Sequence, residues 1–220
     1  DVGFVVDPDV DRLAIISEDG SMFGEEYTLV SVADYVLKNR KGNSVSNLSS
    51  TRALREITEK NGGAYYASAV GEVNVIEEMK KRNAVIGGEG NGGVIYPELH
   101  YGRDALAGIA LFLSNLAISG KKCSELRAEY PGYFISKKKI NLVSRKEIDV
   151  IFESLKNEYT DYQIYDIDGL KIEFDTEWVH VRISNTEPII RIYAESRTME
   201  SADDLAEKII RDIEKNIAGR

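Results

Sequence analysis

The stretch "SVSNLSSTRALREITEKNGGAYYASAVGEVNVIEEMKKRNAVIGG", residues 44–88, decides the fold of this chain. Short apolar segments alternate in it with segments of helical character: strands at 44–48, 64–70 and 84–88, and helices at 50–62 and 74–82. Short strands that alternate with helices predict a largely parallel sheet with helices on both faces. Ligands of such sheets collect at the carboxyl ends of the strands.

Further segments extend this α/β/α pattern on both sides. Residues 2–6 are apolar and β-branched and predict a strand, and a second strand follows with a turn at Asp19-Gly20. Residues 25–42 place acidic residues first, basic residues last and apolar residues at helical spacing. The most apolar window, "ALAGIALFLSNLAISG" at 105–120, is too short and too interrupted to span a bilayer, which needs about 20 apolar residues. We expect it to be a buried helix.

The pattern changes near Pro131-Gly132. Strands then lie between two helices: strands at 133–143, 171–175, 177–183 and 189–196, and helices at 144–159 and 199–217. This order predicts a small α+β domain with an antiparallel sheet. The predicted fold class is therefore α/β, a parallel-sheet α/β/α domain followed by a smaller α+β domain, with the boundary near residue 132.

Composition restricts the function. The 220 residues carry 28 Lys and Arg against 37 Asp and Glu, a net charge of −9, and hydrophobic residues make up 43%. An acidic chain with a real core predicts a globular protein that binds neither nucleic acid nor an anionic membrane, so an anionic ligand would need a local cationic pocket. The single cysteine, Cys123, excludes an internal disulfide, and no targeting signal is visible, so we expect a cytoplasmic protein.

Three loops could carry chemistry, and the first is acidic. "DPDVDR" places Asp7, Asp9 and Asp11 at alternate positions and ends at Arg12. Carboxylates are the hard oxygen ligands that Mg²⁺ takes while it keeps positions for water or phosphate. An arginine beside such an ion is suited to clamp a phosphate that bridges both. The alternative is a solvated acidic turn.

The second loop is "GGEGNGG", residues 87–93, directly after the predicted strand 84–88. Its glycines allow a ligand to approach the backbone closely, and Glu89 and Asn91 offer a carboxylate and an amide. A glutamate among glycines would repel a pyrophosphate but suits the hydroxyl groups of a sugar. The alternative is a flexible loop without a ligand.

The third loop is "RISNTEP", residues 182–188, between two predicted strands. Five residues bring together a guanidinium, two hydroxyls and an amide, a set suited to a phosphate: Arg182, Ser184, Asn185 and Thr186. This loop would be the local cationic pocket that an acidic chain requires. The alternative is a hairpin turn rich in Ser and Asn for conformational reasons. We expect the nearby Arg191 to pair with a carboxylate, Glu187 or Glu195.

In this order and at these distances, the three motifs resemble those of the α-D-phosphohexomutase superfamily, which includes phosphoglucomutase, phosphomannomutase and phosphoglucosamine mutase. "DIDGLKIEF" before the last loop is also similar, and the resemblance covers essentially the whole chain. It implies a four-domain enzyme in which a phosphoserine of the first domain donates a phosphoryl group to a hexose phosphate. The bisphosphate formed then reorients and returns a phosphoryl group, which interconverts hexose 6-phosphate and 1-phosphate.

The resemblance also implies roles for individual residues. Asp7, Asp9 and Asp11 would hold Mg²⁺, and Arg12 would be a catalytic residue beside the transferring phosphate. The remaining candidates would bind substrate: Glu89 and Asn91 the sugar hydroxyls, and Arg182, Ser184, Asn185 and Thr186 the non-reacting phosphate. Residues 1–21 would be the end of domain 2, residues 22–132 domain 3 and residues 133–220 domain 4.

Comparison with the family pattern adds three points. The loop that bears the family's nucleophile is not in this chain, so we expect a fragment that is inactive alone and whose partners are the missing N-terminal domains. Many relatives have a serine and later a histidine where this chain has Asn91 and Gly93. "VSNLSS", residues 45–50, looks more like phosphoglucosamine mutases and favours glucosamine phosphate. Phosphomannomutase or phosphoglucomutase activity is the first alternative, and a non-catalytic module that binds sugar phosphate or cations is the second.

Overall fold

A computed structural model of the chain describes residues 1–141, 145–184 and 187–218. The chain forms two compact units, Asp1–Gly132 (unit 1) and Tyr133–Arg220 (unit 2). Residues 1–21, assigned above to the end of a preceding domain, lie within unit 1, and that assignment stays a prediction. Each unit is described by itself.

The central sheet of unit 1 has four strands, in the order β4-β3-β5-β6. Strand β3 (Asn43–Asn47) pairs in parallel with β4 (Tyr65–Ser68) and with β5 (Ala84–Glu89). The short β6 (Gly93–Ile95) pairs antiparallel with β5. The largely parallel sheet is confirmed, and the glycine loop proves to be the turn of a hairpin between β5 and β6.

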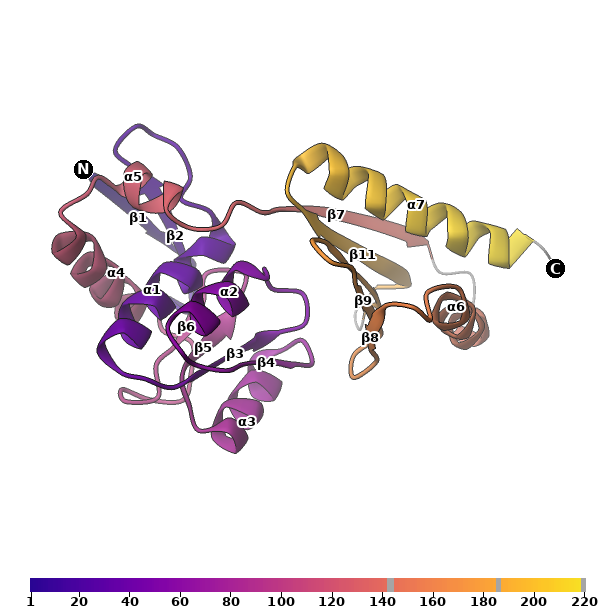
Figure 1. The fold of residues 1–220 in the computed structure, drawn as a ribbon, viewed down its shortest axis with the longest axis horizontal. Coiled ribbons are helices and arrows are strands. Elements are labelled where there is room, and N and C mark those ends of the chain that lie inside the picture. Colours follow the sequence, from indigo (N-terminus) through magenta and orange to yellow (C-terminus); the bar gives the residue numbers. More distant parts are fainter. Residues whose placement is uncertain (142–144, 185–186, 219–220) are drawn as a thin grey trace. The chain divides into compact units, whose positions relative to one another are not determined.

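Helices cover both faces of this sheet, as predicted (Figure 1): α1 (Glu25–Asn39), α2 (Ala53–Lys60) and α3 (Glu72–Arg82). Successive side chains of a strand point to opposite faces. The Ser44 hydroxyl lies 2.6 Å from that of Thr58 on α2. The next residue, Val45, belongs to a buried cluster with Val75 and Met79 of α3. Helices α2 and α3 therefore lie on opposite faces.

A separate two-stranded hairpin precedes this sheet. Strands β1 (Val2–Val6) and β2 (Leu13–Ser17) pair antiparallel, and the acidic loop joins them. Phe4 of β1 and Phe112 of α4 (Ala105–Ser119) contact edge to face, with ring centroids 6.1 Å apart. Helix α4 begins because the Asp104 carboxylate accepts the N–H of Ala107 at 2.9 Å, and α5 (Cys123–Ala128) follows it.

Helix α4 is present where the sequence predicts it, but the expectation that it is buried is wrong for one side. Phe112 and Asn115 are buried, whereas Leu106 and Ile118 are 64% and 74% exposed. The sequence hides this division because apolar residues occupy both faces, so no polar stripe marks the outer one. In the described part of the chain, no helix is long and apolar enough to cross a membrane.

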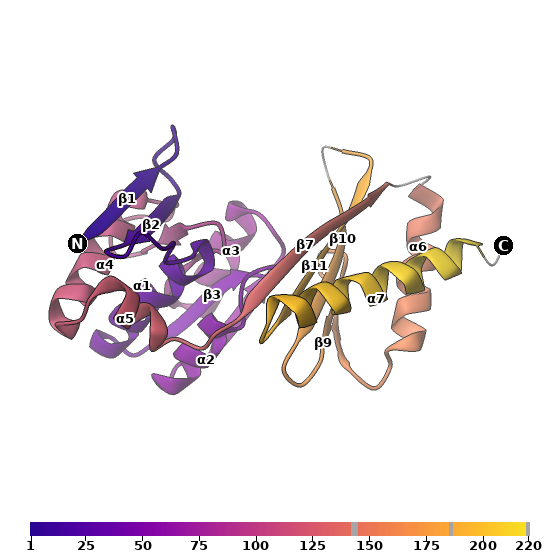
Figure 2. The same ribbon diagram turned by 90° about the horizontal axis from the view of Figure 1, so that it is seen from above.

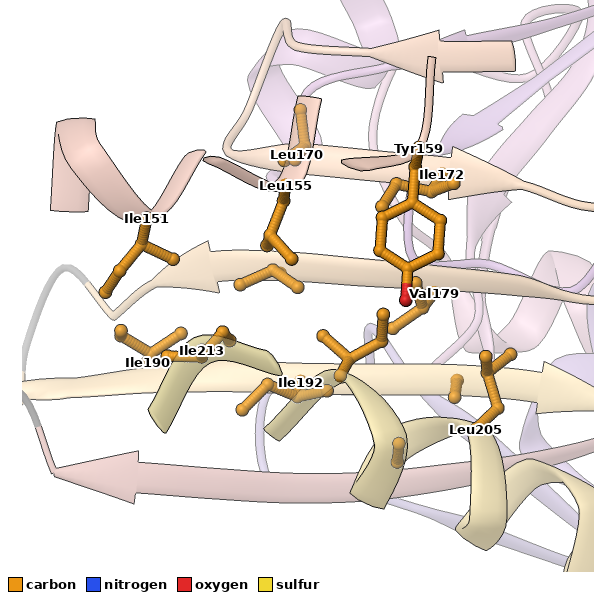
Figure 3. Close-up of a cluster of buried hydrophobic side chains, with 14 residues drawn as sticks. Ile151, Leu155, Tyr159, Leu170, Ile172, Val179, Ile190, Ile192, Leu205 and Ile213 are labelled. Atoms are coloured by element: carbon orange, nitrogen blue, oxygen red, sulfur yellow. The ribbon is translucent and has the colours of Figure 1, made fainter. Parts of the chain in front are cut away.

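Unit 2 contains the predicted antiparallel sheet, in the order β7-β11-β10-β9-β8, with both helices on one face (Figure 2). Its elements are β7 (Phe134–Asn141), α6 (Arg145–Glu158), β8 (Gln163–Tyr165), β9 (Leu170–Glu173), β10 (Trp178–Ile183), β11 (Ile189–Ser196) and α7 (Met199–Ala218). Figure 3 shows the core between sheet and helices, where Leu155 of α6 and Ile213 of α7 pack against Ile172 and Ile192. The predicted fold class is confirmed.

The other face of β10 carries polar side chains that are also buried. His180 is buried, and its Nε2 donates to the carbonyl oxygen of Asp168 at 2.6 Å. Burial lowers the pKa of His180 from the ordinary 6.5 to about 4, and the charges of Lys171 and Arg182 act in the same direction. His180 is therefore neutral in the folded protein at neutral pH.

This lowered pKa predicts acid sensitivity of unit 2. Between pH 6.5 and 4 the unfolded state binds a proton that the folded state does not, so stability falls as pH decreases, by about 1.4 kcal/mol per pH unit. The single tryptophan, Trp178, lies in unit 2, so its fluorescence during urea unfolding measures this loss. His180→Gln should flatten the profile over this range. An unchanged slope in that variant would contradict the assignment to His180.

Candidate functional site

The acidic loop is a tight turn held by its own backbone. Asp7 Oδ1 accepts the N–H groups of Asp11 at 3.1 Å and Arg12 at 3.2 Å, and the Asp7 carbonyl accepts the N–H of Val10 at 3.0 Å. Val10 has a φ of 56°, a region that a β-branched residue rarely adopts. The loop therefore keeps a strained conformation that brings Asp7 and Asp11 together.

The carboxyl groups of Asp7 and Asp11 lie next to each other. Burial and the neighbouring Asp7 raise the pKa of Asp11. Partial burial opposes ionisation of Asp7 too, but the backbone N–H of Arg12 and the neighbouring Asp11 lower its pKa. Arg12 Nε lies 3.6 Å from both carboxylates, on a half-exposed side chain, and Asp9 is exposed.

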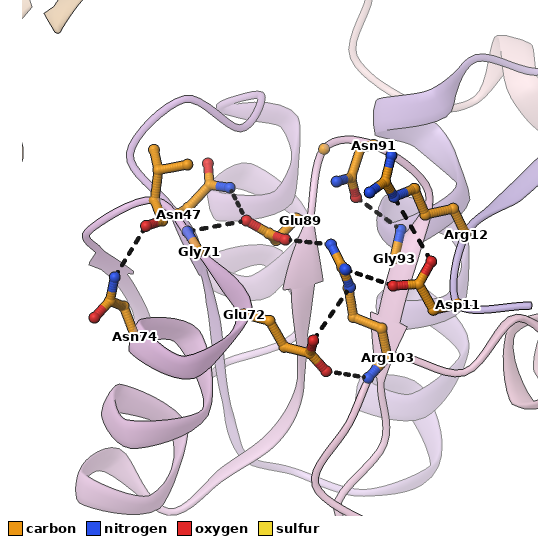
Figure 4. Close-up of polar contacts among 12 residues, drawn as sticks. Asp11, Arg12, Asn47, Gly71, Glu72, Asn74, Glu89, Asn91, Gly93 and Arg103 are labelled. Carbon is orange, nitrogen blue, oxygen red and sulfur yellow. Dashed lines mark hydrogen bonds and ion pairs between the residues drawn. The ribbon is translucent and has the colours of Figure 1, made fainter. Parts of the chain in front are cut away.

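Arg103 connects the acidic loop to the glycine loop (Figure 4). Its guanidinium pairs with Asp11, lies 2.7 Å from Glu89 Oε2 and 3.6 Å from Glu72 Oε2. Its backbone N–H donates to Glu72 Oε1 at 2.8 Å. The Arg103 side chain is only 13% exposed, so three carboxylates surround one largely buried cation.

Glu89 lies at the end of β5, at the carboxyl edge of the parallel strands. Its side chain is buried, and Oε1 accepts the Asn47 amide at 2.8 Å and the Gly71 N–H at 3.2 Å. Asn47 ends β3 and Gly71 precedes α3, so together with Arg103 three segments fix one carboxylate. The structure thus places Glu89 where ligands of such sheets bind.

The glycines of this loop allow close packing on neighbouring segments. A side chain at Gly90 would meet the carboxylate of Glu26, and one at Gly92 would meet the Leu13 carbonyl. The Leu13 N–H donates to the Gly92 carbonyl at 3.2 Å, so the backbone of the glycine loop contacts the start of β2, directly after the acidic loop. Asn91 is half-buried, and its Oδ1 accepts the N–H of Gly93 at 3.2 Å.

The third loop lies in unit 2 at the end of β10. Arg182 Nε is buried, lies 3.4 Å from Asp168 Oδ2 and has no hydrogen-bond partner among the described residues. Ser184 is buried, and its hydroxyl accepts the Glu187 N–H at 3.3 Å and Arg191 Nη2 at 3.4 Å. Two predicted phosphate ligands lie outside the described residues: Asn185 and Thr186.

Two arginines face each other at this loop. Arg182 and Arg191 are cross-strand partners in β10 and β11, an arrangement that like charges disfavour. Glu187 offsets part of the charge, because Arg191 pairs with it at 3.1 Å, as predicted. Beside the loop lies a cavity of about 290 Å³, whose charged lining residues are Glu187, Arg191, Lys137, Lys138 and Lys139. Lys138 pairs with Asp203 at 3.0 Å, so Lys137, Lys139 and Arg191 supply the cationic character. An anion is the ligand that this charge pattern fits.

The structure brings Asp7, Asp11 and Glu89 into one network with Arg103 and Asn47, two residues that the sequence analysis did not name as site residues. No hydrogen bond or ion pair joins Asp9 or Asn91 to Arg103 in the described part of the chain. The roles predicted for these site residues stay predictions. Arg103 lies in no motif, and Asn47 lies in "VSNLSS", which was read only for substrate preference. Their contacts join segments of unit 1 that are far apart in the chain.

The acidic loop fits Mg²⁺ in part. Asp11 Oδ1 is buried and makes no hydrogen bond in the described part of the chain, so an oxygen is available to an ion. Mg²⁺ often takes one or two carboxylates and completes its shell with water and phosphate oxygens. Over residues 1–141, 145–184 and 187–218, no three His, Cys, Asp or Glu side chains are placed so that together they could hold one metal ion. Asp7 and Asp11 therefore fit, and the contribution of Asp9 stays a prediction.

Comparison with known proteins identifies both units. Residues 24–133 match the model for "Phosphoglucomutase/phosphomannomutase, alpha/beta/alpha domain III", and residues 137–212 match the model for the C-terminal domain of the same family. A phosphoglucomutase/phosphomannomutase of Thermococcus kodakarensis is 37% identical over 100% of this chain and 48% of its own length. A probable phosphoglucosamine mutase of Pyrococcus horikoshii is 33% identical over 99% of this chain and 50% of its own length.

The fold agrees with these matches. The crystal structure of a phosphoglucomutase/phosphomannomutase family protein from Burkholderia thailandensis superposes with a TM-score of 0.84 at 23% identity, over 100% of this chain and 47% of the other. The chain spans about half the length of the relatives that it matches. It belongs to the phosphoglucomutase/phosphomannomutase family of α-D-phosphohexomutases.

Proposed function

We propose that this chain provides the sugar-binding and phosphate-binding parts of a mutase that interconverts hexose 6-phosphates and 1-phosphates. One observation carries the proposal: in a chain of net charge −9, Arg182 and Arg191 face each other across β10 and β11, and Lys137 and Lys139 line the cavity beside Arg191. This is the local cationic pocket that an acidic protein needs to hold a phosphate. Ser184 adds a hydroxyl, and Asn185 and Thr186 would complete the grip.

The network of unit 1 suits the sugar and the reacting phosphate. Glu89, held by Asn47 and Arg103, offers a fixed carboxylate to sugar hydroxyls, and Asn91 would lie on the same loop. Mg²⁺, held by Asp7, Asp11 and Asp9, would neutralise charge on the transferring phosphoryl group. The exposed guanidinium of Arg12 would orient that group's oxygens. Phosphoryl transfer depends mostly on positioning and on such neutralisation.

Glucosamine phosphate is the substrate that we favour. The segment "VSNLSS" suggested it, and Asn47 of that segment donates directly to Glu89 at 2.8 Å. The name of the Pyrococcus horikoshii relative supports the same choice. Glucose or mannose phosphate is the alternative, because the three sugars differ by few contacts.

Calorimetry tests the phosphate grip. Glucosamine 6-phosphate titrated into the chain with Mg²⁺ should bind, and Arg182→Ala should weaken binding at least about tenfold, since a charge-assisted pair is lost. Arg211→Ala removes an exposed arginine from the same unit and should leave affinity within about twofold. If both variants weaken binding of glucosamine 6-phosphate equally, Arg182 contributes only general electrostatic attraction. That result would refute the proposal.

Turnover is expected to need more than these residues. The described network contains carboxylates and arginines but no activated serine, and the resemblance assigns the phosphoserine to a domain outside these 220 residues. A coupled assay with glucosamine 6-phosphate, Mg²⁺ and hexose bisphosphate should give no more than trace mutase activity from this chain. Turnover comparable to that of a complete relative would show that the chain carries its own phosphoryl donor.

A further inference from the structure

Arg103 joins the acidic loop to the glycine loop through two separate atoms. Its Nη2 pairs with Asp11 Oδ2, and its Nη1 lies 2.7 Å from Glu89 Oε2. A guanidinium is planar and rigid, so its two nitrogens move together. Among the described residues, no hydrogen bond or ion pair joins Glu89 directly to Asp7 or Asp11. A change of charge at Asp11 can therefore reach Glu89 through Arg103.

The charges of this network do not balance. It contains four carboxylates and two guanidinium groups: Asp7, Asp11, Glu72 and Glu89, and Arg12 and Arg103. With all four carboxylates ionised, two negative charges are left over, which is the charge that Mg²⁺ neutralises. Asp11 Oδ1 is buried and makes no hydrogen bond in the described part of the chain, so this excess lies next to Arg103.

The third contact of Arg103 is the loosest. Its Nε is buried, lies 3.6 Å from Glu72 Oε2 and makes no hydrogen bond within the described residues. A separation of 3.6 Å is too long for a hydrogen bond, so Glu72 attracts this side of the guanidinium by charge alone. The close contacts with Asp11 and Glu89 therefore set the position of the guanidinium.

Glu89 has room for one more hydrogen-bond donor. A carboxylate offers about four acceptor sites, two on each oxygen. Oε1 accepts the Asn47 amide and the Gly71 N–H, and Oε2 accepts Arg103. The remaining site lies on Oε2, beside the guanidinium. The position of Arg103 therefore decides how a sugar hydroxyl can approach Glu89.

We propose that Arg103 is a positioning residue that couples cation binding at Asp7 and Asp11 to the setting of Glu89. When Asp11 shares its charge with an ion, Arg103 pairs more strongly with Glu89 and fixes Oε2 for the sugar. In reverse, the charge of Glu89 offsets part of the positive charge of Arg103 and so weakens the repulsion between Arg103 and the ion. The inference rests on the proposed function, which takes the acidic loop as the metal site and Glu89 as a sugar ligand.

Magnesium chloride titrated into the ¹⁵N-labelled chain, without sugar, tests the coupling. Backbone amides of residues 7–12 report binding of the ion. The side-chain amide of Asn47 reports the state of Glu89, which it contacts at 2.8 Å. Both sets of signals should shift with the same dissociation constant.

Coupling between two sites is reciprocal, so a change at Glu89 must alter the affinity for Mg²⁺. Glu89→Gln keeps the shape of the side chain but removes its charge, and it should weaken Mg²⁺ binding at least about fivefold. Glu78→Gln is the matched control, because it removes one negative charge from α3 of the same unit, where Glu78 pairs with Arg82. It should change the affinity less than about twofold, since solvent screens distant charges.

Arg103→Lys distinguishes the two-armed bridge from the charge. Lysine keeps the positive charge but lacks the rigid fork. Residues 7–12 should still respond to Mg²⁺ in this variant, whereas the Asn47 side chain should not. If the variant does not fold, the comparison of Glu89→Gln with Glu78→Gln decides alone.

Three results would overturn the coupling and leave the proposed function in place. They are an Asn47 side chain that ignores Mg²⁺ in the unchanged chain, an undiminished Asn47 response in Arg103→Lys, and equal Mg²⁺ affinities of Glu89→Gln and Glu78→Gln. If residues 7–12 of the unchanged chain do not respond to Mg²⁺, the metal site itself is refuted, and the coupling with it.

Discussion

Replacing Arg103 with methionine is expected to lower the stability of unit 1 by about 3–5 kcal/mol at pH 7. The substitution keeps most of the side-chain volume but removes the cation that Asp11, Glu72 and Glu89 share. Glu89 is buried and cannot recover water, so its negative charge would be left without its counter-ion in a site of low polarity.

Two optical signals show which unit loses stability. Far-UV circular dichroism follows unfolding of both units, whereas Trp178 fluorescence follows unit 2. Arg103→Met should shift the first and leave the second unchanged. Arg40→Met is the matched control, because Arg40 pairs with Glu98 on the surface of the same unit and should contribute less than about 1 kcal/mol. Similar losses in the two variants would show that the buried network is not what holds the loops together.

Alanine at Gly92 is expected to cost about 2–4 kcal/mol, whereas alanine at Gly20 should cost about 1 kcal/mol. Both glycines have a φ of 84°, so the two substitutions share the same backbone strain. They differ in their surroundings: nothing lies within 4 Å of a Cβ at Gly20, whereas one at Gly92 would meet the backbone of Leu13. The difference between the variants therefore measures the contact between the glycine loop and Leu13, the first residue of β2 after the acidic loop.

Urea unfolding followed by far-UV circular dichroism gives the loss of stability in Gly92→Ala and in Gly20→Ala. Gly92→Ala should also weaken binding of a hexose phosphate, since it displaces the segment next to Glu89, and Gly20→Ala should not. If the two variants lose equal stability, close packing of Gly92 on Leu13 does not stabilise unit 1. The network at Arg103 would then not depend on that packing.

Most of the fold follows from periodicity. Strands such as 84–88 and helices such as 25–42 are long enough for their apolar spacing to show. Near Pro131 the strict alternation of strands and helices ends, which marks the beginning of the α+β part. Strands β6 and β8 have three residues each and α5 has six, too few for a period to appear. The exposure of α4 was missed because a uniformly apolar sequence does not tell which side faces out.

The candidate site also contains some residues that the sequence predicts and others that only the fold reveals. Asp7, Asp11, Glu89 and Arg182 could be proposed from the sequence because each lies in a short motif whose residue types suit one ligand. Arg103 follows no motif, and its partners lie far from it along the chain, at residues 11, 72 and 89. Such a residue is found only when the fold brings its partners together. The roles of Asp9 and Asn91 stay predictions.

The central claim is that two loops bind ligand groups: the glycine loop of unit 1 binds sugar hydroxyls, and the loop of unit 2 that begins with Arg182 binds a phosphate. Amide NMR shifts of the ¹⁵N-labelled chain with Mg²⁺ test it most directly. Glucosamine 6-phosphate should shift residues 88–93 and residues 182–184, whereas inorganic phosphate should shift only the second group. If the sugar phosphate shifts the same residues as inorganic phosphate, and residues 88–93 do not respond, the claim is contradicted.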